Sequence, residues 1–327
     1  MRDESWRGLL PDKIRRARGL IYHYTDPGGL VGAIQKKELW ATEATGMNDL
    51  AEVRQGWAFI REWLKEQVDD DVTRIIQSMA CGDPSDADSD SYDGVSGIFM
   101  CCASTRGDDA NQWRLYANGG RGYAVALDAS VPLTAVVDGS DPRGPHRSGF
   151  VTTVREFAVV SPWLHVLYRE KAKLAALDGL LEAGRKGWTD ALAKSSSEDE
   201  RERDKEELWE LMGTGLATIA QLMKSEGFAG ENEVRTIVYD PFQTVSQFRA
   251  SQNGVIQYVR LTQEPTKRLS HRARYEDDLG AEKTLPLRSV RLGPLLHAQN
   301  NKATVMHLLR RNGFGSATAE ESGVPLR

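Results

Sequence analysis

The sequence predicts an α+β fold, and three observations lead to this prediction. Segments rich in aromatic and β-branched residues, typical of strands, occur near the start of the chain at 20–25 and near its end at 231–239, 254–262 and 287–292. A mostly helical pattern lies between them, at about 170–225. The chain lacks the regular strand–helix alternation of a parallel sheet, so we expect strands and helices in largely separate blocks.

The first elements are predicted as strand, helix, strand and long helix. The strand 20–25 stops at a Pro-Gly-Gly turn, and the helix that follows closes at Lys36 and Lys37, which favour the negative end of its dipole. A short strand at 39–42 precedes a long helical pattern from about Leu50 to Met79. Within this pattern the tryptophans have core-facing spacing, so we interpret them as packing residues.

An acidic stretch and a compact strand–helix–strand block come next. Residues 81–97 interleave aspartates with serine and glycine, which favours a mobile acidic loop. Three alternating aspartates there resemble the start of a calcium loop, but the required glycine and closing glutamate are missing. The run 98–105 is apolar until Ser104 and Thr105, as in a buried strand, and a helix at about 108–117 and a strand at 123–128 follow.

The rest of the chain is predicted to be a loop, short strands and helices. Residues 131–150 are rich in Pro, Gly and Asp, and the segments 151–160 and 164–168 have strand character. The stretch 170–225 is interpreted as a helical insertion with a charged break at 195–204, and a last helix spans about 301–311. A polar tail at 314–327 is predicted to be disordered. We found no repeat and no clean linker, so we expect a single domain over 1–327.

Composition excludes several classes of protein. The 327 residues are 40% hydrophobic and 27% charged with a net charge of −5, as in globular proteins. No apolar run reaches the roughly 18 residues of a membrane span and no signal core begins the sequence, so we expect a cytoplasmic protein without a membrane partner. Residues 241–327 carry 13 basic and 7 acidic side chains, which allows a nucleic-acid substrate without favouring it.

The three cysteines do not have the spacing of a zinc site, and His165, His271, His297 and His307 show no metal-ligand spacing with one another. Cys101 and Cys102 are chain neighbours within an apolar run, which favours small buried side chains over a disulfide or a zinc site. We therefore predict no metal.

Three places interrupt the hydrophobic pattern: His23, the segment from Ser104 to Tyr116, and the segment from Glu231 to Arg235. Strand alternation would place Glu231, Glu233 and Arg235 on one face, where two carboxylates repel each other unless Arg235 or a ligand compensates. The competing interpretation is a solvated face on which Arg235 pairs with Glu233. Likewise, a lone histidine between two tyrosines, as His23 is, is more often a core histidine with a satisfied hydrogen bond than a catalytic residue.

Taken together, these segments resemble a bacterial domain-of-unknown-function family. The motifs that carry the resemblance are Tyr22-His23-Tyr24-Thr25, Met47-Asn48-Asp49 followed by Glu52, Trp113-x-x-Tyr116, and Glu231-x-Glu233-x-Arg235. That family is in turn similar to the ADP-ribosyltransferase superfamily, which has a first-strand His or Arg, a middle-strand residue and a late Glu in this order. The resemblance implies a split, bent mixed β-sheet with flanking helices, and NAD as a substrate.

The resemblance also implies roles for individual residues. Glu233 would stabilise the oxocarbenium-like state, and Glu231 would orient or deprotonate the acceptor. His23, with the adjacent Tyr24 and Thr25, would hold the cofactor. Ser104, Trp113 and Tyr116 would lie near the nicotinamide, although this middle strand lacks the superfamily's tyrosine. The alternative is that Trp113 and Tyr116 simply pack their helix onto the sheet.

The function implied by this resemblance is transfer of ADP-ribose to a macromolecular acceptor, protein or nucleic acid. It implies a toxin or a phage-defence effector, with a possible neutralising partner protein. Two alternatives stay open: an NAD glycohydrolase, and a nonenzymatic module that senses a nucleotide or binds a protein. Whether Glu233 and His23 face one cavity discriminates catalysis from binding.

Overall fold

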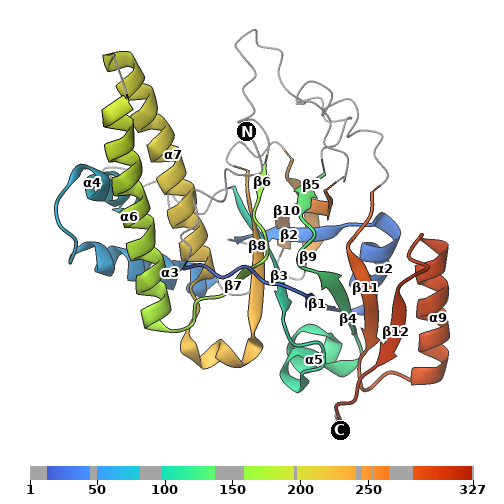
Figure 1. Ribbon diagram of the computed structural model, residues 1–327. Coiled ribbons are helices and arrows are strands. Elements are labelled where there is room, and N and C mark those ends of the chain that lie inside the picture. Colours follow the sequence, from blue (N-terminus) through green and yellow to red (C-terminus); the bar gives the residue numbers. More distant parts are fainter. Residues whose placement is uncertain are drawn as a thin grey trace. The chain divides into compact units, whose positions relative to one another are not determined.

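The computed structural model has two compact units (Figure 1). It describes residues 13–44, 50–81, 97–136, 158–194, 197–240, 245–251, 254–264 and 283–325. One unit, here the helical unit, comprises Met1–Arg15, Glu43–Ile98 and His165–Ala229. The other, here the sheet unit, comprises Arg16–Thr42, Phe99–Leu164 and Gly230–Arg327. This division differs from the predicted single domain over 1–327, because the stretch 170–225 shares its contacts with the helices that precede residue 98.

The described strands form one mixed, mostly antiparallel sheet. They are β1 (Leu20–Thr25), β2 (Leu39–Glu43), β3 (Ile98–Ser104), β4 (Tyr123–Asp128), β5 (Leu133–Ala135), β6 (Val159–Val160), β7 (Leu164–His165), β8 (Glu233–Tyr239), β9 (Gln247–Ser251), β10 (Gly254–Gln263), β11 (Leu287–Leu292) and β12 (Thr318–Glu321). Their order is β12-β11-β4-β1-β3-β2-β10-β5, with β8 also paired to β3 and β9 to β10. The ladder between β11 and β12 is parallel, whereas β1 pairs antiparallel with both β3 and β4. A mixed sheet with helices agrees with the predicted α+β class.

Helices of the sheet unit cover both faces of the sheet. They are α2 (Pro27–Lys36), α5 (Ala110–Tyr116) and α9 (Ala298–Arg311), together with a 3-10 turn, Asn118–Gly120. Helices α2 and α9 contribute Leu30 and Leu309 to the main core, where they join Ile21 and Val125 of the strands. Helix α5 packs on the opposite face, where Trp113 joins a separate cluster with Tyr24, Ala117 and Ala124. Cys101 belongs to the main core and is buried, as predicted for a small apolar residue.

Helix α2 begins three residues earlier than the apolar pattern indicates. The Asp26 side chain accepts a hydrogen bond from the Gly29 N–H at 2.6 Å, and Pro27 supplies a preset φ at the first helical position. At the other end, Lys37 has a φ of 57°, and its N–H bonds to the Ala33 carbonyl. The turn residues therefore belong to the helix start.

The C-terminal segment is ordered up to residue 325, so the predicted disordered tail at 314–327 is wrong for 314–325. Phe314, Ala317 and Ala319 are buried in the main core. Residues 318–321 form β12, and Val290 of β11 pairs with Ala319. Short apolar residues at alternating positions are a weak sequence signal, but they suffice when a neighbouring strand offers a free edge.

The helical unit contains α3 (Leu50–Leu64), α4 (Asp71–Cys81), α6 (Glu170–Lys194) and α7 (Glu198–Leu222). The 3-10 turn that follows α7, Glu226–Glu231, begins in the helical unit, and its last two residues belong to the sheet unit. Helices α6 and α7 run side by side as a long pair (Figure 1). The predicted charged break at 195–204 is shorter than expected, because the Ser197 hydroxyl caps α7 by accepting from the Glu200 N–H. Trp57 and Trp63 are buried, as their spacing predicts.

Gly56 allows α3 to approach α7 closely. A Cβ atom at this position would lie 2.5 Å from the Ala220 carbonyl oxygen, so any larger residue would push the two helices apart.

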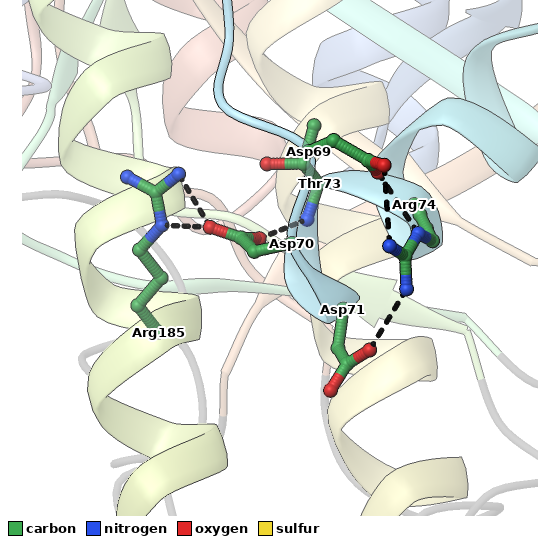
Figure 2. Close-up of polar contacts among 6 residues, drawn as sticks. All are labelled: Asp69, Asp70, Asp71, Thr73, Arg74 and Arg185. Carbon is green, nitrogen blue, oxygen red and sulfur yellow. Dashed lines mark hydrogen bonds and ion pairs between the residues drawn. The ribbon is translucent and has the colours of Figure 1, made fainter.

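The predicted helix from Leu50 to Met79 is in fact two helices, α3 and α4. Asp70 ends the connection by capping α4: its Oδ1 accepts from the Thr73 N–H at 2.8 Å (Figure 2). The other oxygen, Oδ2, accepts from the Arg185 guanidinium of α6, at 2.7 Å from Nε and 2.6 Å from Nη2. Burial alone would raise the pKa of this carboxyl, but the bonds from Thr73 and Arg185 together hold it below its usual value.

Several sequence predictions lie outside the described residues. They are the Met47-Asn48-Asp49 motif, the acidic loop beyond Cys81, and most of the loop and strand predicted between 137 and 157. In the described part of the chain, no helix is both long enough and apolar enough to cross a membrane.

Asp70→Ala should destabilise the helical unit by about 1–2 kcal/mol, because it removes an N-cap. Asp70→Asn keeps a capping side chain and loses only the half-buried ion pair to Arg185, so it should cost less than about 1 kcal/mol. Urea unfolding followed by circular dichroism measures both. Equal losses in the two variants would contradict the capping role.

Candidate functional site

Three of the predicted motif segments lie on neighbouring strands of the sheet. Strand β3 pairs with both β1 and β8, and Tyr22 of β1 lies opposite Ser104 of β3. The Thr105 N–H, just beyond β3, donates to the Asn232 carbonyl just before β8 at 3.0 Å. The first-strand, middle-strand and late motifs are therefore adjacent in space, although they are up to about 210 residues apart in the sequence.

Glu231 is the residue on which the predicted site residues converge. Its carbonyl oxygen accepts hydrogen bonds from Ser104 Oγ at 2.7 Å and from Gln112 Nε2 at 3.4 Å. One of its carboxylate oxygens, Oε1, accepts from the Tyr116 hydroxyl at 3.1 Å. Glu231 is 8% exposed, whereas Tyr116 is 47% exposed, so the pair lies where a buried polar cluster meets the surface.

Strand alternation predicted that Glu231 and Glu233 share one face of a strand. The structure does not have this arrangement. Strand β8 begins at Glu233, and Glu231 belongs to the preceding 3-10 turn. The residue between them, Asn232, has a φ of 47°, in the left-handed region that asparagine tolerates better than most residues. This turn of the backbone takes Glu231 out of the strand alternation on which the predicted shared face depends.

Glu233 forms a buried, two-pronged ion pair with Arg235. Arg235 Nε lies 2.7 Å from Glu233 Oε1, and Nη2 lies 3.0 Å from Oε2. The Glu233 side chain is 10% exposed and the Arg235 side chain is 4% exposed. The ion pair predicted for this strand is therefore present, but it lies on a buried face and not on a solvated one. Burial, reinforced by the Glu233 charge, raises the pKa of the Cys102 thiol, which places Cys102 beside this pair.

His23 makes one hydrogen bond in the described part of the chain, from ring Nδ1 to the Cys102 carbonyl at 2.8 Å. A carbonyl only accepts, so Nδ1 carries the proton. Burial lowers the pKa of His23, while the bond to Cys102 opposes that shift, and the ring is therefore neutral near pH 7. This agrees with a histidine that satisfies a main-chain group.

The side chains of His23 and Glu233 extend to opposite faces of the sheet. On β1, His23 lies opposite Val125, a member of the main core, so alternation directs it to the core side. On β8, Val234 and Val238 belong to the same core, so Glu233 is directed to the other side. The three predicted catalytic residues are thus close along the sheet, but they do not share one face.

Trp113 is a packing residue and has no exposed surface for a nicotinamide ring. Its indole meets the Tyr24 ring edge-on, with centroids 4.8 Å apart and an interplanar angle of 79°. Tyr24 is also buried, and its hydroxyl donates to the Arg106 carbonyl at 2.9 Å. Thr25, at the end of β1, pairs with Tyr123 of β4. Of the predicted aromatic contacts, Tyr116 alone keeps a substantially exposed ring.

Asp108 links α5 to the C-terminal segment. Its carboxylate accepts from Trp113 Nε1 at 2.7 Å, from Ser322 Oγ at 2.5 Å and from the Gly323 N–H at 2.7 Å. Val324 packs beside the Trp113 cluster. These contacts fix the helix that carries Gln112 and Tyr116.

Sequence reasoning missed Gln112, Cys102 and Asp108. Gln112 and Tyr116 are four residues apart on α5 and therefore share a face, which is a usable signal. The Trp113-x-x-Tyr116 spacing indicated Trp113 as the neighbour of Tyr116 in the site, but Gln112 takes that place. Asp108 carried no signal, because its partners Ser322 and Gly323 lie in the segment predicted to be disordered.

Glu52 belongs to the motif in the helical unit, and its carboxylate forms a second buried ion pair. Its Oε1 lies 2.9 Å from Lys224 Nζ, and both side chains are less than one-tenth exposed. Lys224 Nζ also lies 5.0 Å from the centre of the Phe228 ring. Among the described residues, no group of three or more His, Cys, Asp or Glu side chains is arranged to hold a metal ion.

Residues 112–236 match the model of a family described as a protein of unknown function, DUF2971. The matched range begins at Gln112 of α5 and ends within β8, so it includes Tyr116, Glu231, Glu233 and Arg235. Neither the curated proteins nor the solved structures compared with the chain gave a match. A domain of an unknown-function family is therefore present, and it includes Glu231 with two of its partners, Gln112 and Tyr116, whereas Ser104 precedes the matched range.

Glu233→Gln should destabilise the sheet unit by about 3 kcal/mol, because it removes the charge of one partner from a buried ion pair. Both side chains are buried, so we do not expect this variant to leave folding intact. Arg235→Gln should cost a similar amount, and the double variant should cost clearly less than the sum.

Urea unfolding of the four proteins measures this coupling. Arg288→Gln, which breaks an exposed pair with Asp128, serves as a control and should cost less than about 1 kcal/mol. Additive losses in the Glu233 and Arg235 variants would contradict the buried pair.

Stability should fall as the pH drops below about 6.5, because the unfolded chain protonates His23 there while the folded chain, with its lowered pKa, does not. The contribution of His23 is at most about 1.4 kcal/mol per pH unit. In His23→Gln, whose amide can still donate to Cys102, this dependence should weaken. Urea midpoints at pH 7.5 and 5.5 compare the proteins, and an unchanged difference in the variant would exclude His23 as its source.

Proposed function

We propose that this chain transfers ADP-ribose from NAD to a macromolecular acceptor, with Glu231 and Glu233 as the carboxylates of the site. The observation that carries this proposal is the convergence of Ser104 and Tyr116 on Glu231. These residues were selected from the sequence as parts of one site, and independent hydrogen bonds join them. Chance similarity of motifs does not require such contacts.

The proposed reaction breaks the bond between nicotinamide and ribose C1′. Nicotinamide leaves with the bonding electron pair, and the acceptor nucleophile forms a new bond to C1′ while its proton passes to Glu231. The Tyr116 hydroxyl holds Glu231 Oε1 in place, and the exposed ring of Tyr116 offers a flat surface to nicotinamide. Glu233, fixed by Arg235, adds negative potential near the developing positive charge.

Two residues have changed roles relative to the sequence prediction. Trp113 packs α5 against Tyr24 of the sheet and does not contact the cofactor in this proposal. His23, whose ring extends to the other face, acts as a positioning residue by holding the Cys102 carbonyl beside the Glu233 pair. The settings of a toxin or a phage-defence effector, and a neutralising partner protein, remain proposals that rest on the resemblance.

A nonenzymatic nucleotide-sensing or protein-binding module is the second candidate, and two observations favour it. His23 and Glu233 extend to opposite faces of the sheet and so do not face one cavity, which argues against catalysis by these two residues together. The charge of Glu233 is compensated by the two-pronged contact with Arg235, which weakens its ability to stabilise a cation elsewhere. NAD hydrolysis is the same chemistry with water as the acceptor, and the experiment below separates it from transfer.

Nicotinamide release from NAD, measured with and without cell lysate, tests the proposal. Glu231→Gln should lower the release rate by about 100-fold or more, as loss of a general base does. Tyr116→Phe should lower it by about fivefold, as loss of one hydrogen bond does. Glu321→Gln, an exposed carboxylate that pairs with Lys302, is the matched control and should not change the rate.

The acceptor dependence distinguishes the candidates. Release that requires lysate, with label from NAD recovered on a macromolecule, supports transfer. Release without lysate indicates hydrolysis. No release under either condition, in protein whose unfolding is cooperative, contradicts both enzymatic readings and leaves the binding module.

A further inference from the structure

A cavity of about 510 Å³ opens between α4, α6 and α7, within the helical unit. Its apolar lining consists of Trp188 of α6, Trp209 of α7 and Ile75 of α4. This volume lies within the usual range for small-ligand sites. All lining residues belong to one unit, so the cavity is defined without reference to the sheet.

The two indoles are not explained by packing alone. Trp57 and Trp63 of the same unit are buried, but Trp209 is 51% exposed and Trp188 is only half-buried. Exposed indole faces bind cations well, because the ring quadrupole is negative above the plane.

Carboxylates surround the aromatic surface. Asp71, Glu202 and Glu206 line the cavity, against a single ammonium group, that of Lys205. Asp71 Oδ1 is 3.3 Å from Arg74, on its own helix (Figure 2). Glu206 makes no ion pair within the part of the chain that the structure describes. Residues 198–207 add to the negative electrostatic potential around the cavity, because seven of them are acidic and three are basic.

Lys205 shows that a cation can occupy this cavity. Its Nζ lies 5.8 Å from the centre of the Trp188 ring and 3.3 Å from Glu202 Oε2. The Lys205 side chain is nearly half exposed, and an exposed ion pair of this kind contributes little free energy. A ligand cation with better geometry would therefore displace it at little cost.

We propose that this cavity binds an arginine side chain of a basic peptide segment. A guanidinium group stacks flat on an indole and pairs with a carboxylate through two parallel hydrogen bonds, which an ammonium group cannot do. Trp209 supplies the stacking surface, and Glu206 supplies the carboxylate. The acidic start of α7 attracts the neighbouring basic residues of the peptide, so a peptide is favoured over an isolated small cation. This proposal is independent of the proposed transferase reaction.

A fluorescently labelled, end-blocked tetra-arginine peptide is the probe, and anisotropy at low salt measures its binding to the full chain. Trp209→Ala and Glu206→Gln should each weaken binding by about three- to tenfold. Lys205→Gln should strengthen binding, because it removes the competing cation. Glu182→Gln, an exposed change of the same charge on α6 outside the cavity lining, should leave the affinity within about twofold.

The gain in Lys205→Gln is the sharpest outcome, since a variant that merely misfolds would lose binding. Weaker binding in Lys205→Gln, or equal binding in Trp209→Ala and wild type, would overturn the proposal. Methylguanidinium that competes with the peptide at equal molar concentration would show that the cavity takes a small cation and would overturn the peptide assignment. A tetra-lysine peptide that binds as tightly as tetra-arginine would overturn the selection of arginine.

Discussion

The main-chain carbonyl of Glu231 is the contact on which the candidate site depends. It is held between a strand residue, Ser104, and a helix residue, Gln112, which come from different parts of the sheet unit. A buried carbonyl must find donors, and here the donors also bring β3, β8 and α5 to one point. The backbone of Glu231 is fixed in this way, so only rotation about its side-chain bonds can move the carboxylate. The hydrogen bond from the Tyr116 hydroxyl selects one of these side-chain rotamers.

Two of the motif carboxylates are compensated by a cation within their own unit. Glu233 pairs with Arg235 in the sheet unit, and Glu52 pairs with Lys224 in the helical unit. Each pair is costly to desolvate, and hydrophobic residues of similar volume often give equal or better stability. Stability alone therefore does not explain why this chain keeps charges in both places. A role in orienting groups or binding a ligand is a sufficient reason to retain them.

Much of the fold was predictable from local patterns. Strand β11 spans 287–292 as predicted, and β10 and α9 differ from their predictions by only a few residues, because periodicity marks elements with one buried face. The prediction of a disordered C-terminal tail was wrong, because β12 offers only a few small apolar residues and depends on the edge of β11. The helix at 50–79 failed for the opposite reason: the apolar period continues through a connection that a single capping residue, Asp70, interrupts.

The candidate site was predictable as a set of residues but less so as a geometry. The sequence singled out Ser104, Tyr116 and Glu231 as candidate site residues, because polar residues at strand ends stand out from an apolar background. Hydrogen bonds join these three residues in the structure. It could not place Glu231 off the strand, since one left-handed residue, Asn232, changes the direction of the chain and leaves no trace in the alternation. It also could not determine the face on which His23 lies relative to β8, because that depends on strand order.

The carboxylate of Asp108 has a consequence for the order of events during synthesis. Its partner Ser322 lies 214 residues further along the chain. At a translation rate of roughly 5–20 residues per second, this separation corresponds to about 10–40 s. For that interval a nascent chain holds α5 without the C-terminal contacts that fix it, and Trp113 and Tyr24 lack the cover of Val324. The polar cluster around Glu231 is therefore among the last parts of the sheet unit to become fully braced.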